Sequence, residues 1–389
     1  MKIMIVAGMY PPIITGTSFY AQNLTRALSE AGHEVSIVTV KRVNGAYQLP
    51  DEHEQGQLLV LAGISIPLQR FFKHYAFCSF FPGNIAKLMR FMERKKPDAV
   101  IIINQYFDIA ILATLCATAL KIPLYCSIGT QILNKNPVIH NIFKFFDKLI
   151  CYGMILRFCR KTFAWDSEIK RYLIETHGQK FADRVPIIPY SVNGDFDKLA
   201  SLEHDYSYKG IMLGVGSVIE QRNYFPAIKA FAKIADKFLD LKFIIIGHVY
   251  YQPTMELVNN LGLNDRVVFM QEQPHDVVLE YMSKCDVTWT QLTGKYGALG
   301  TANIEAMLCG VPVIVNADAG LIGDPLLIDG ETAFLVPGKT EAELAQMLEQ
   351  ILTNKNLREN VGRQGKKFVM STMTWPNVVK RIEEELLAS

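Results

Sequence analysis

Residues 294–315 read GKYGALGTANIEAMLCGVPVIV. The run starts with a glycine-rich approach, continues into a short predicted helix that carries Glu305, and ends at Gly310–Val311–Pro312 before an apolar strand. An acid beside glycine-rich backbone, near the carboxyl ends of parallel strands, stands where doubly wound sheets bind ligands. A carboxylate there holds a vicinal diol, such as two ribose hydroxyls, by two charge-assisted hydrogen bonds. The alternative is a Glu at a helix start that the helix dipole alone favours.

On both sides of this segment, short β-rich runs alternate with amphipathic stretches, the pattern of parallel sheets that helices cover on both faces. The sequence therefore predicts an α/β fold with two similar sheets in succession. The predicted strands are 2–7, 34–40, 58–61, 99–103 and 124–127 in the first series and 210–215, 242–246, 266–270, 287–290 and 313–315 in the second. The predicted helices are 18–31 in the first series and 224–238, 252–261, 276–284 and 303–309 in the second.

The polar stretch 193–207 interrupts the apolar pattern and predicts a domain boundary. We expect a first domain over residues 1–200, a second over 201–373 and a C-terminal helix over 374–389 that packs back on the first domain. Pro376 suits the first turn of that helix.

The chain has 389 residues, of which 50% are hydrophobic, and this composition excludes a disordered chain. Its seven cysteines never form a Cys-x-x-Cys pair and predict reduced core thiols of a cytoplasmic protein. The apolar run 109–120 is shorter than the roughly 20 residues of a membrane-spanning helix. The first residues predict a strand rather than a signal peptide, because no small-residue cleavage site follows them.

Charge is unevenly divided along the chain. Residues 1–200 carry 23 Lys and Arg against 15 Asp and Glu, a net charge of +8, whereas residues 201–389 carry 17 against 23, a net charge of −6. A basic half suits nucleic acid, an anionic bilayer or a phosphorylated substrate.

Two more strand–loop–helix segments have the geometry of phosphate sites, because a helix N-terminus offers free N–H groups and a favourable dipole. Residues 10–17, YPPIITGT, place Gly16 there without a Cβ in the way of an oxygen, although a plain turn is an equal alternative. Residues 214–231, GVGSVIEQRNYFPAIKAF, place Arg222 at a helix entry, where a guanidinium suits a diphosphate. An exposed arginine on a surface turn is the alternative. Neither Gly-x-Gly-x-x-Gly nor a Walker loop is present, so a dehydrogenase or P-loop enzyme is not indicated.

With these residues in order, the chain resembles the family 4 retaining glycosyltransferases of the GT-B architecture over nearly its whole length. The matching pieces are Tyr10–Pro12 with Gly16, LSEAGHEVSIVT (28–39), KPDAVI (96–101), DSEIKRYL (166–173), IPYSVNGDF (188–196), IIIGH (244–248), the segment around Glu305, GETAFLVP (330–337) and Trp375. The resemblance implies two Rossmann-like doubly wound domains that face a cleft, the first for the acceptor and the second for the nucleotide.

The same resemblance assigns roles to residues. It implies that Gly16 lends a backbone amide to the donor diphosphate, Arg222 neutralises that diphosphate, Glu305 binds the nucleotide ribose and Gly300–Thr301 add amides to the phosphates. Ser217 occupies the place of the first cation of the phosphate pair. The nucleotide-sugar is then a co-substrate, and we expect no further cofactor and no catalytic metal, since His140, His177, His248 and His275 are too scattered to form a ligand set.

The chain departs from the family pattern at four places. Gly297 stands eight residues before Glu305, where the family has a second acid, and Ser217 replaces a cation. Gly129 follows the strand 124–127 where a His is common, and Thr15–Gly16 replace a glycine pair. These departures leave a catalytically inactive GT-B scaffold as the alternative to a transferase, with a nucleotide-sugar epimerase as a third option.

Residues 67–96 and 140–161 mix aromatic with basic side chains. Such mixtures suit an anionic bilayer surface, here the inner face of the cell membrane. Nucleic acid is the rival partner, but no nucleic-acid motif accompanies these residues. An ordinary helix with a buried aromatic face and a solvated basic edge is an equal alternative. The family resemblance implies transfer of a sugar from a UDP- or GDP-sugar, and with it we expect a lipid-linked or polysaccharide acceptor.

Overall fold

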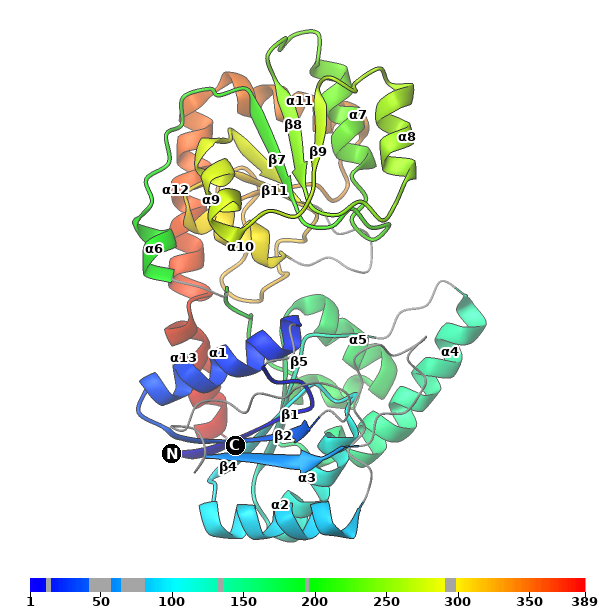
Figure 1. Cartoon of the computed structure of the whole chain (residues 1–389), viewed down its shortest axis with the longest axis vertical. Coiled ribbons are helices and arrows are strands. Elements are labelled where there is room, and N and C mark those ends of the chain that lie inside the picture. The colour runs from blue at the N-terminus through cyan, green and yellow to red at the C-terminus, as the bar shows by residue number, and fades with distance from the viewer. Residues whose placement is uncertain are drawn as a thin grey trace. The chain divides into compact units, whose positions relative to one another are not determined.

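The computed structural model describes residues 1–11, 15–41, 57–63, 81–131, 136–192, 196–290 and 299–388. The chain divides into two compact units: unit 1 comprises Met1–Tyr190 with Trp375–Ser389, and unit 2 comprises Ser191–Thr374. Each unit is a Rossmann-like α/β domain with one parallel sheet (Figure 1). The predicted fold class is therefore confirmed.

Unit 1 is built on a sheet in the order β3-β2-β1-β4-β5-β6. Its strands are β1 (Lys2–Ala7), β2 (Glu34–Lys41), β3 (Leu58–Ala62), β4 (Ala99–Ile103), β5 (Leu124–Ile128) and β6 (Lys161–Ala164). Its helices are α1 (Gly16–Glu30), α2 (Pro82–Lys95), α3 (Asp108–Ala119), α4 (Pro137–Phe146), the π-helix η2 (Asp147–Tyr152), the short η3 (Leu156–Phe158), α5 (Ser167–His177), η4 (Gln179–Arg184) and α13 (Trp375–Leu387).

Helices cover both faces of this sheet. Tyr20 and Leu24 of α1 and Val378 of α13 share a core with Ile3 and Ile5 of β1. The alternate residues of β1, among them Met4 and Val6, share the opposite core with residues of α2, α3 and α5. Successive residues of a strand point to opposite faces, so the continuous apolar run Ile3–Ala7 of β1 is buried on both faces of the sheet.

Unit 2 repeats this plan with the strand order β12-β11-β10-β7-β8-β9. Its strands are β7 (Ile211–Val215), β8 (Lys242–Ile246), β9 (Val267–Met270), β10 (Val287–Trp289), β11 (Val313–Val315) and β12 (Phe334–Leu335). Its helices are α6 (Phe196–Ser201), α7 (Phe225–Ile234), α8 (Pro253–Asn260), α9 (His275–Lys284), α10 (Thr301–Leu308), α11 (Glu341–Thr353) and α12 (Lys355–Thr372). Helices α7, α8 and α11 pack on one face, whereas α9 and α10 contact β10 or β7 and α10 contacts α12.

All ten predicted strands are present to within one residue. The prediction missed β6 and β12, which are the short outermost strands at one edge of each sheet. Among the helices that the structure describes, none is both long and apolar enough to cross a bilayer.

Candidate functional site

The carboxyl ends of β7 and β8 are brought together by two glycines of unit 2. Gly216 follows β7 with φ +119°, and Gly247 follows β8 with φ +149°. A Cβ on Gly247 would lie 2.5 Å from the carbonyl carbon of Gly216, so only glycine allows the two loops to touch. The close approach leaves backbone at this edge of the sheet, where doubly wound folds bind ligands.

Arg222 folds back over this glycine contact from the turn before α7. A Cβ on Gly216 would lie 1.9 Å from Nη1 of Arg222, so the glycine also makes room for the guanidinium. Nη1 donates one long hydrogen bond of 3.4 Å to the carbonyl oxygen of Ser217, and the buried Nε atom has no partner. A guanidinium has five N–H donors, so most of its hydrogen-bonding capacity is unused at this edge.

The start of α10 lies beside the end of β10. Gly300 is the N-cap with φ +76°, and Thr301 is the exposed first residue of the helix. The buried side chain of Asn303 fixes this start, because Nδ2 donates to the carbonyl oxygens of Leu299 at 2.7 Å and Thr290 at 2.9 Å. A helix N-terminus held in this way presents N–H groups to an anion.

Glu305 lies one turn further along α10, with only 12% of its side chain exposed. Burial raises the pKa of this carboxyl, and His275 lowers it in part. His275 is the first residue of α9, and its Nε2 lies 3.3 Å from Oε2 of Glu305. The acid is therefore half-enclosed and has a histidine within reach, which the sequence spacing of thirty residues does not reveal.

Gly16 belongs to unit 1, where it is the exposed first residue of α1. The helix start is capped by Thr15, whose Oγ1 accepts from the backbone N–H of Ser18 at 3.1 Å, while Ser18 Oγ accepts from the N–H of Thr15 at 3.0 Å. Among the described residues outside its immediate chain neighbours and the adjacent backbone of α1, none has an atom within 4 Å of a Cβ built on Gly16.

Gly129 has a structural cause in unit 1. A Cβ at this position would lie 1.9 Å from the ring of Trp165. The indole is held in place because Trp165 Nε1 donates to Ser127 Oγ at 2.9 Å and its ring packs on Tyr20 with centroids 4.3 Å apart. Trp165 thus fills the room that a histidine side chain would need.

The remaining residues that the sequence singled out are Gly297, Pro12 and the scattered histidines. Gly297 and Pro12 lie outside the described residues. His248 is an exposed loop residue whose Nδ1 lies 3.2 Å from Gln271 Oε1. Within the described ranges, no group of three or more His, Cys, Asp and Glu side chains has an arrangement that could hold a metal ion.

The two aromatic and basic stretches differ. Residues 67–80 lie outside the described part, and the rest of 67–96 forms α2, whose Leu88, Phe91 and Met92 are buried as in an ordinary helix. By contrast, α4, which overlaps the stretch 140–161, has no buried residue. Phe143, Phe145 and Phe146 are all exposed on it.

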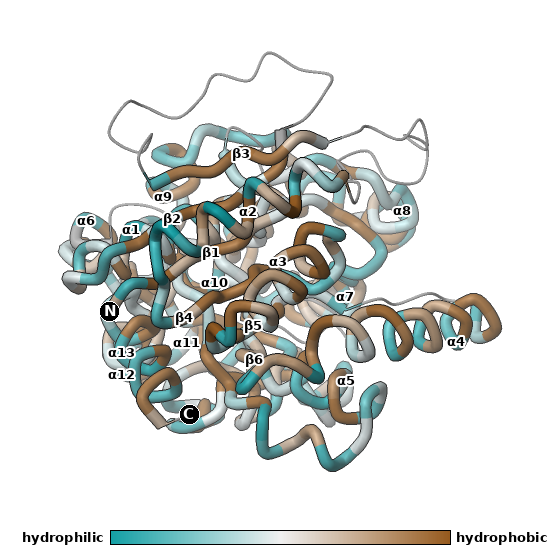
Figure 2. The backbone as a smooth tube through the Cα atoms, turned by 90° about the horizontal axis from the view of Figure 1, so that it is seen from below, coloured by the Kyte–Doolittle hydropathy of each residue, from teal (hydrophilic) through white to brown (hydrophobic). Residues whose placement is uncertain are grey.

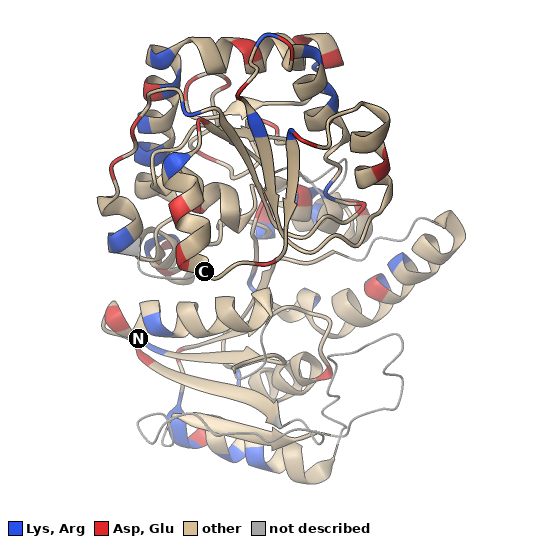
Figure 3. Cartoon of the chain, turned by 45° about the horizontal axis from the view of Figure 1, so that its top comes forward, with Lys and Arg blue, Asp and Glu red and all other residues tan. Residues whose placement is uncertain are grey.

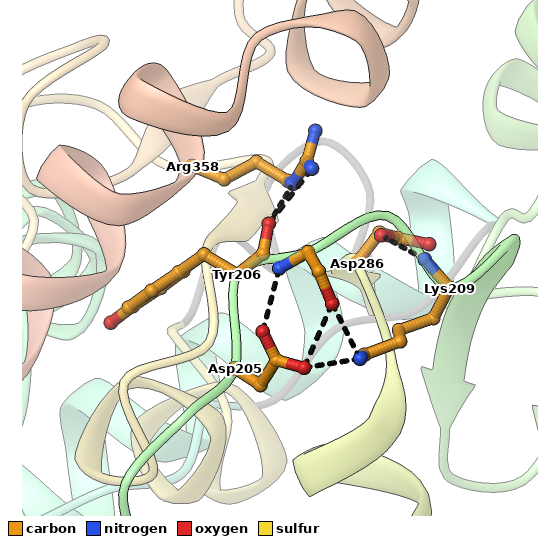
Figure 4. Close-up of polar contacts among 6 residues, drawn as sticks. Asp205, Tyr206, Lys209, Asp286 and Arg358 are labelled. Carbon is orange, nitrogen blue, oxygen red and sulfur yellow. Dashed lines mark hydrogen bonds and ion pairs between the residues drawn. The ribbon is translucent and has the colours of Figure 1, made fainter.

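A second polar cluster lies in unit 2 at the amino ends of the strands, opposite the edge that carries Arg222 and Glu305 (Figure 4). Arg358 is only 2% exposed, and it donates to the carbonyl oxygens of Ile351 at 2.6 Å, Leu352 at 2.7 Å and Tyr206 at 2.8 Å. Asp286, just before β10, accepts from the N–H groups of Lys209 and Ile211, each at 2.8 Å. This cluster joins the start of β7 to α11 and α12 and has a structural role.

Comparisons with known proteins agree with this architecture. The family described as Glycosyltransferase Family 4 matches residues 14–196, and Glycosyl transferases group 1 matches residues 203–368. An uncharacterised glycosyltransferase of Methanocaldococcus jannaschii is 23% identical over 98% of this chain and 96% of its own. The capsular polysaccharide biosynthesis glycosyltransferase CapM of Staphylococcus aureus is 25% identical over 58% of this chain, which covers 61% of that relative.

Solved structures show the same fold. The structure of Anabaena HepE in complex with UDP covers 100% of both chains with a TM-score of 0.73 at 15% identity. The apo form of the lipopolysaccharide outer core galactosyltransferase WaaB covers 100% of this chain and 99% of its own, with a TM-score of 0.66 at 12% identity. Identities this low support the fold alone.

Proposed function

The chain belongs to family 4 of the GT-B glycosyltransferases, and from that premise we propose that it transfers a sugar from a UDP- or GDP-sugar to a lipid-linked or polysaccharide acceptor. The observation that supports this donor class most is the guanidinium of Arg222, which has unused donors over the Gly216–Ser217 loop. One relative is named as a capsular polysaccharide biosynthesis glycosyltransferase, and structures of a fold neighbour contain UDP, which agrees with the proposal.

The proposed roles follow from charge. As the bond between the anomeric carbon and the diphosphate breaks, negative charge accumulates on the leaving oxygens, and donors already aimed at them supply the largest protein contribution. Arg222 suits this role because its planar fork binds phosphate oxygens in pairs. The amides of Gly300 and Thr301 at the start of α10, and of Gly16 at the start of α1, are further proposed donors to the phosphates.

Glu305 is the proposed ribose ligand. Its ionised carboxylate accepts two hydrogen bonds from a vicinal diol, and its half-enclosed position strengthens them. We propose retention of anomeric configuration: the acceptor hydroxyl attacks on the face that the diphosphate leaves, and its proton passes to a diphosphate oxygen. This step needs no side-chain base, so it is compatible with Gly129.

The acceptor side of the proposal rests on unit 1. The exposed apolar residues of α4 and η2 are interspersed with Lys144 and Lys148. This mixture suits docking to an anionic membrane, where each basic residue contributes about 1 kcal/mol. Figure 3 shows basic residues along α4 and α2. We propose that the enzyme works as a peripheral protein at the cytoplasmic face of the cell membrane.

A thermal-shift comparison of UDP, GDP, ADP and TDP tests the donor class. One nucleotide at about 100 times its dissociation constant adds roughly 2.7 kcal/mol to the unfolding free energy. The stabilisation falls to about a third in Glu305→Ala, as a loss of roughly 2 kcal/mol in nucleotide affinity requires, and it stays at the wild-type value in Glu280→Ala, a matched variant at an exposed acid of α9. No shift with any nucleotide contradicts the proposed donor, and binding without transfer to any acceptor leaves a nucleotide-binding scaffold.

A further inference from the structure

Unit 1 contains a cavity of about 280 Å³ beneath the end of α4. It is lined by the loop that follows β4, the start of α3, the last turn of α4 and the π-helix η2. This volume has room for one sugar-sized ring, and the open mouth lets a longer ligand extend outward. Its lining differs from the floor to the mouth.

The floor carries buried polar atoms without partners. Gln105 is 1% exposed, and neither Oε1 nor Nε2 has a hydrogen-bond partner. Asp147 is 2% exposed; its Oδ2 accepts from the hydroxyl of Tyr172, while its Oδ1 has no partner. Buried amide and carboxylate atoms are nearly always satisfied in folded proteins, so these two side chains in a cavity lining indicate a polar ligand.

The local backbone is also unusual. Asp147 is the first residue of η2, which has π-helical geometry over six residues. Such wide turns are rare and recur at functional sites. The turn places Asp147, Ile150 and Cys151 on the cavity lining together.

The mouth of the cavity is apolar. Phe143, Phe146 and Ile150 line it and are at the same time exposed on the surface of the unit. In Figure 2, α4 extends away from the sheet with hydrophobic positions along its length. The cavity wall is therefore continuous with an exposed apolar helix face, and an amphiphile can lie with its polar end inside and its chain along α4.

The chemistry of the floor selects the polar end. Among the described residues, no Lys or Arg lines the cavity, whereas the acidic Asp147 and Asp108 do. Nearby His177 adds no positive charge at neutral pH, because burial lowers its pKa to about 4. Lys144 and Lys148 lie close enough to lower the pKa of His177 further, but they do not line the cavity, so a phosphate inside it would have no direct cationic partner in the described part of the chain. A hydroxylated neutral ring, by contrast, can donate to Asp147 and both donate to and accept from Gln105.

We propose that this cavity binds the hydroxylated head of a neutral lipid acceptor, with the apolar chain over Phe143, Phe146 and Ile150. The inference rests on the proposed function for the identity of the ligand as acceptor, but the binding itself does not depend on the donor site. Lys144 and Lys148 beside the mouth then attract the anionic bilayer in which such a lipid resides.

Calorimetric titration of the full chain with octyl glucoside below its micellar concentration tests the cavity. We expect saturable binding that weakens at least tenfold in Gln105→Leu and in Phe146→Ser. Phe145→Ser is the matched control, because Phe145 is more exposed than Phe146 and does not line the cavity; its affinity stays at the wild-type value. Octyl phosphate binds more weakly than octyl glucoside.

Equal losses in Phe145→Ser and Phe146→Ser overturn the proposal, since they indicate adsorption to the exposed face of α4. Unchanged binding in both Gln105→Leu and Phe146→Ser, tighter binding of octyl phosphate, or no binding of octyl glucoside overturns it as well. The thermal shift with UDP, GDP, ADP and TDP, measured on the same samples, separates the two proposals: its absence with all four nucleotides contradicts the donor site and leaves the cavity result standing. Urea unfolding of each variant verifies that it is folded.

Discussion

In unit 2, the edge of the sheet where the parallel strands begin (the amino edge) and the edge where they end (the carboxyl edge) each carry an arginine and an acid. The side chains of the two pairs have different hydrogen-bond partners. At the amino edge, the guanidinium of Arg358 meets three carbonyl oxygens and both oxygens of Asp286 accept backbone N–H groups. At the carboxyl edge, Arg222 makes one long hydrogen bond and Glu305 has one histidine beside it.

This difference in hydrogen-bond partners distinguishes side chains that stabilise the fold from side chains that are available to a ligand. A polar side chain whose bonds are all made within the protein stabilises the fold and has nothing left for a ligand. A polar side chain with spare donors or acceptors, at the edge where parallel strands end, is available to one. Residue type alone does not distinguish the role of Arg358 from that of Arg222. Only the hydrogen-bond partners of the two guanidinium groups do.

The strongest test of the amino edge is Arg358→Met, which keeps apolar volume and removes the donors. Three carbonyl oxygens lose their partner, so the unfolding free energy falls by about 4 kcal/mol, at a cost of 1–3 kcal/mol for each unsatisfied buried group. Urea unfolding measures the loss. Arg363→Ala, an exposed arginine on the same helix, changes stability by less than about 0.5 kcal/mol. A small effect of Arg358→Met would remove the structural role.

At the carboxyl edge, we expect Arg222→Ala to reduce activity strongly and stability little, the opposite of Arg358→Met. Loss of a donor to the leaving group lowers the transfer rate by about 100-fold, or about 2.7 kcal/mol, with little change in stability. Arg222→Lys recovers part of the rate, because it keeps the charge without the planar fork. Equal rates in the Ala variant and the wild type, measured with the same donor, would exclude the leaving-group role.

Glu305→Ala is expected to affect binding rather than folding. Removing a charged acceptor from the ribose hydroxyls weakens the nucleotide by roughly 2 kcal/mol. Titration calorimetry gives the dissociation constant, with Glu280→Ala as the exposed control. A dissociation constant that does not change would take Glu305 out of the nucleotide site.

The smallest effect is expected for His275→Ala, and it depends on pH. Burial raises the pKa of Glu305, so the carboxylate needed for the diol is lost at a higher pH than usual as the solution is acidified. His275 opposes this rise, so its removal moves the loss of nucleotide affinity to still higher pH. In the acid range, we expect His275→Ala to bind the nucleotide more weakly than the wild type by roughly 1 kcal/mol. At alkaline pH the two affinities converge.

Nucleotide titrations between pH 5.5 and 8.5 verify this dependence, with His140→Ala as a control in unit 1. Parallel curves for His275→Ala and the wild type would contradict it. Tighter binding in His275→Ala would show that the histidine competes with the nucleotide for Glu305.

The sequence predicted the strands well, because each buried parallel strand is a continuous apolar run. It missed β6 and β12, since four and two residues are too few to show a period. The placement of Arg222 and Glu305 on one sheet edge follows from strand–loop–helix order. The partners His275, Asn303 and Trp165 do not, because tertiary packing brings them from other segments and no local pattern marks them.

The most direct test of this account compares UDP with uridine on the wild type and on Arg222→Ala. If the spare donors of the carboxyl edge serve a diphosphate, the wild type binds UDP much more tightly than uridine, and Arg222→Ala loses most of that preference while its affinity for uridine stays the same. An equal preference for UDP in both proteins would contradict the claim that the unused donors of Arg222 mark the diphosphate site.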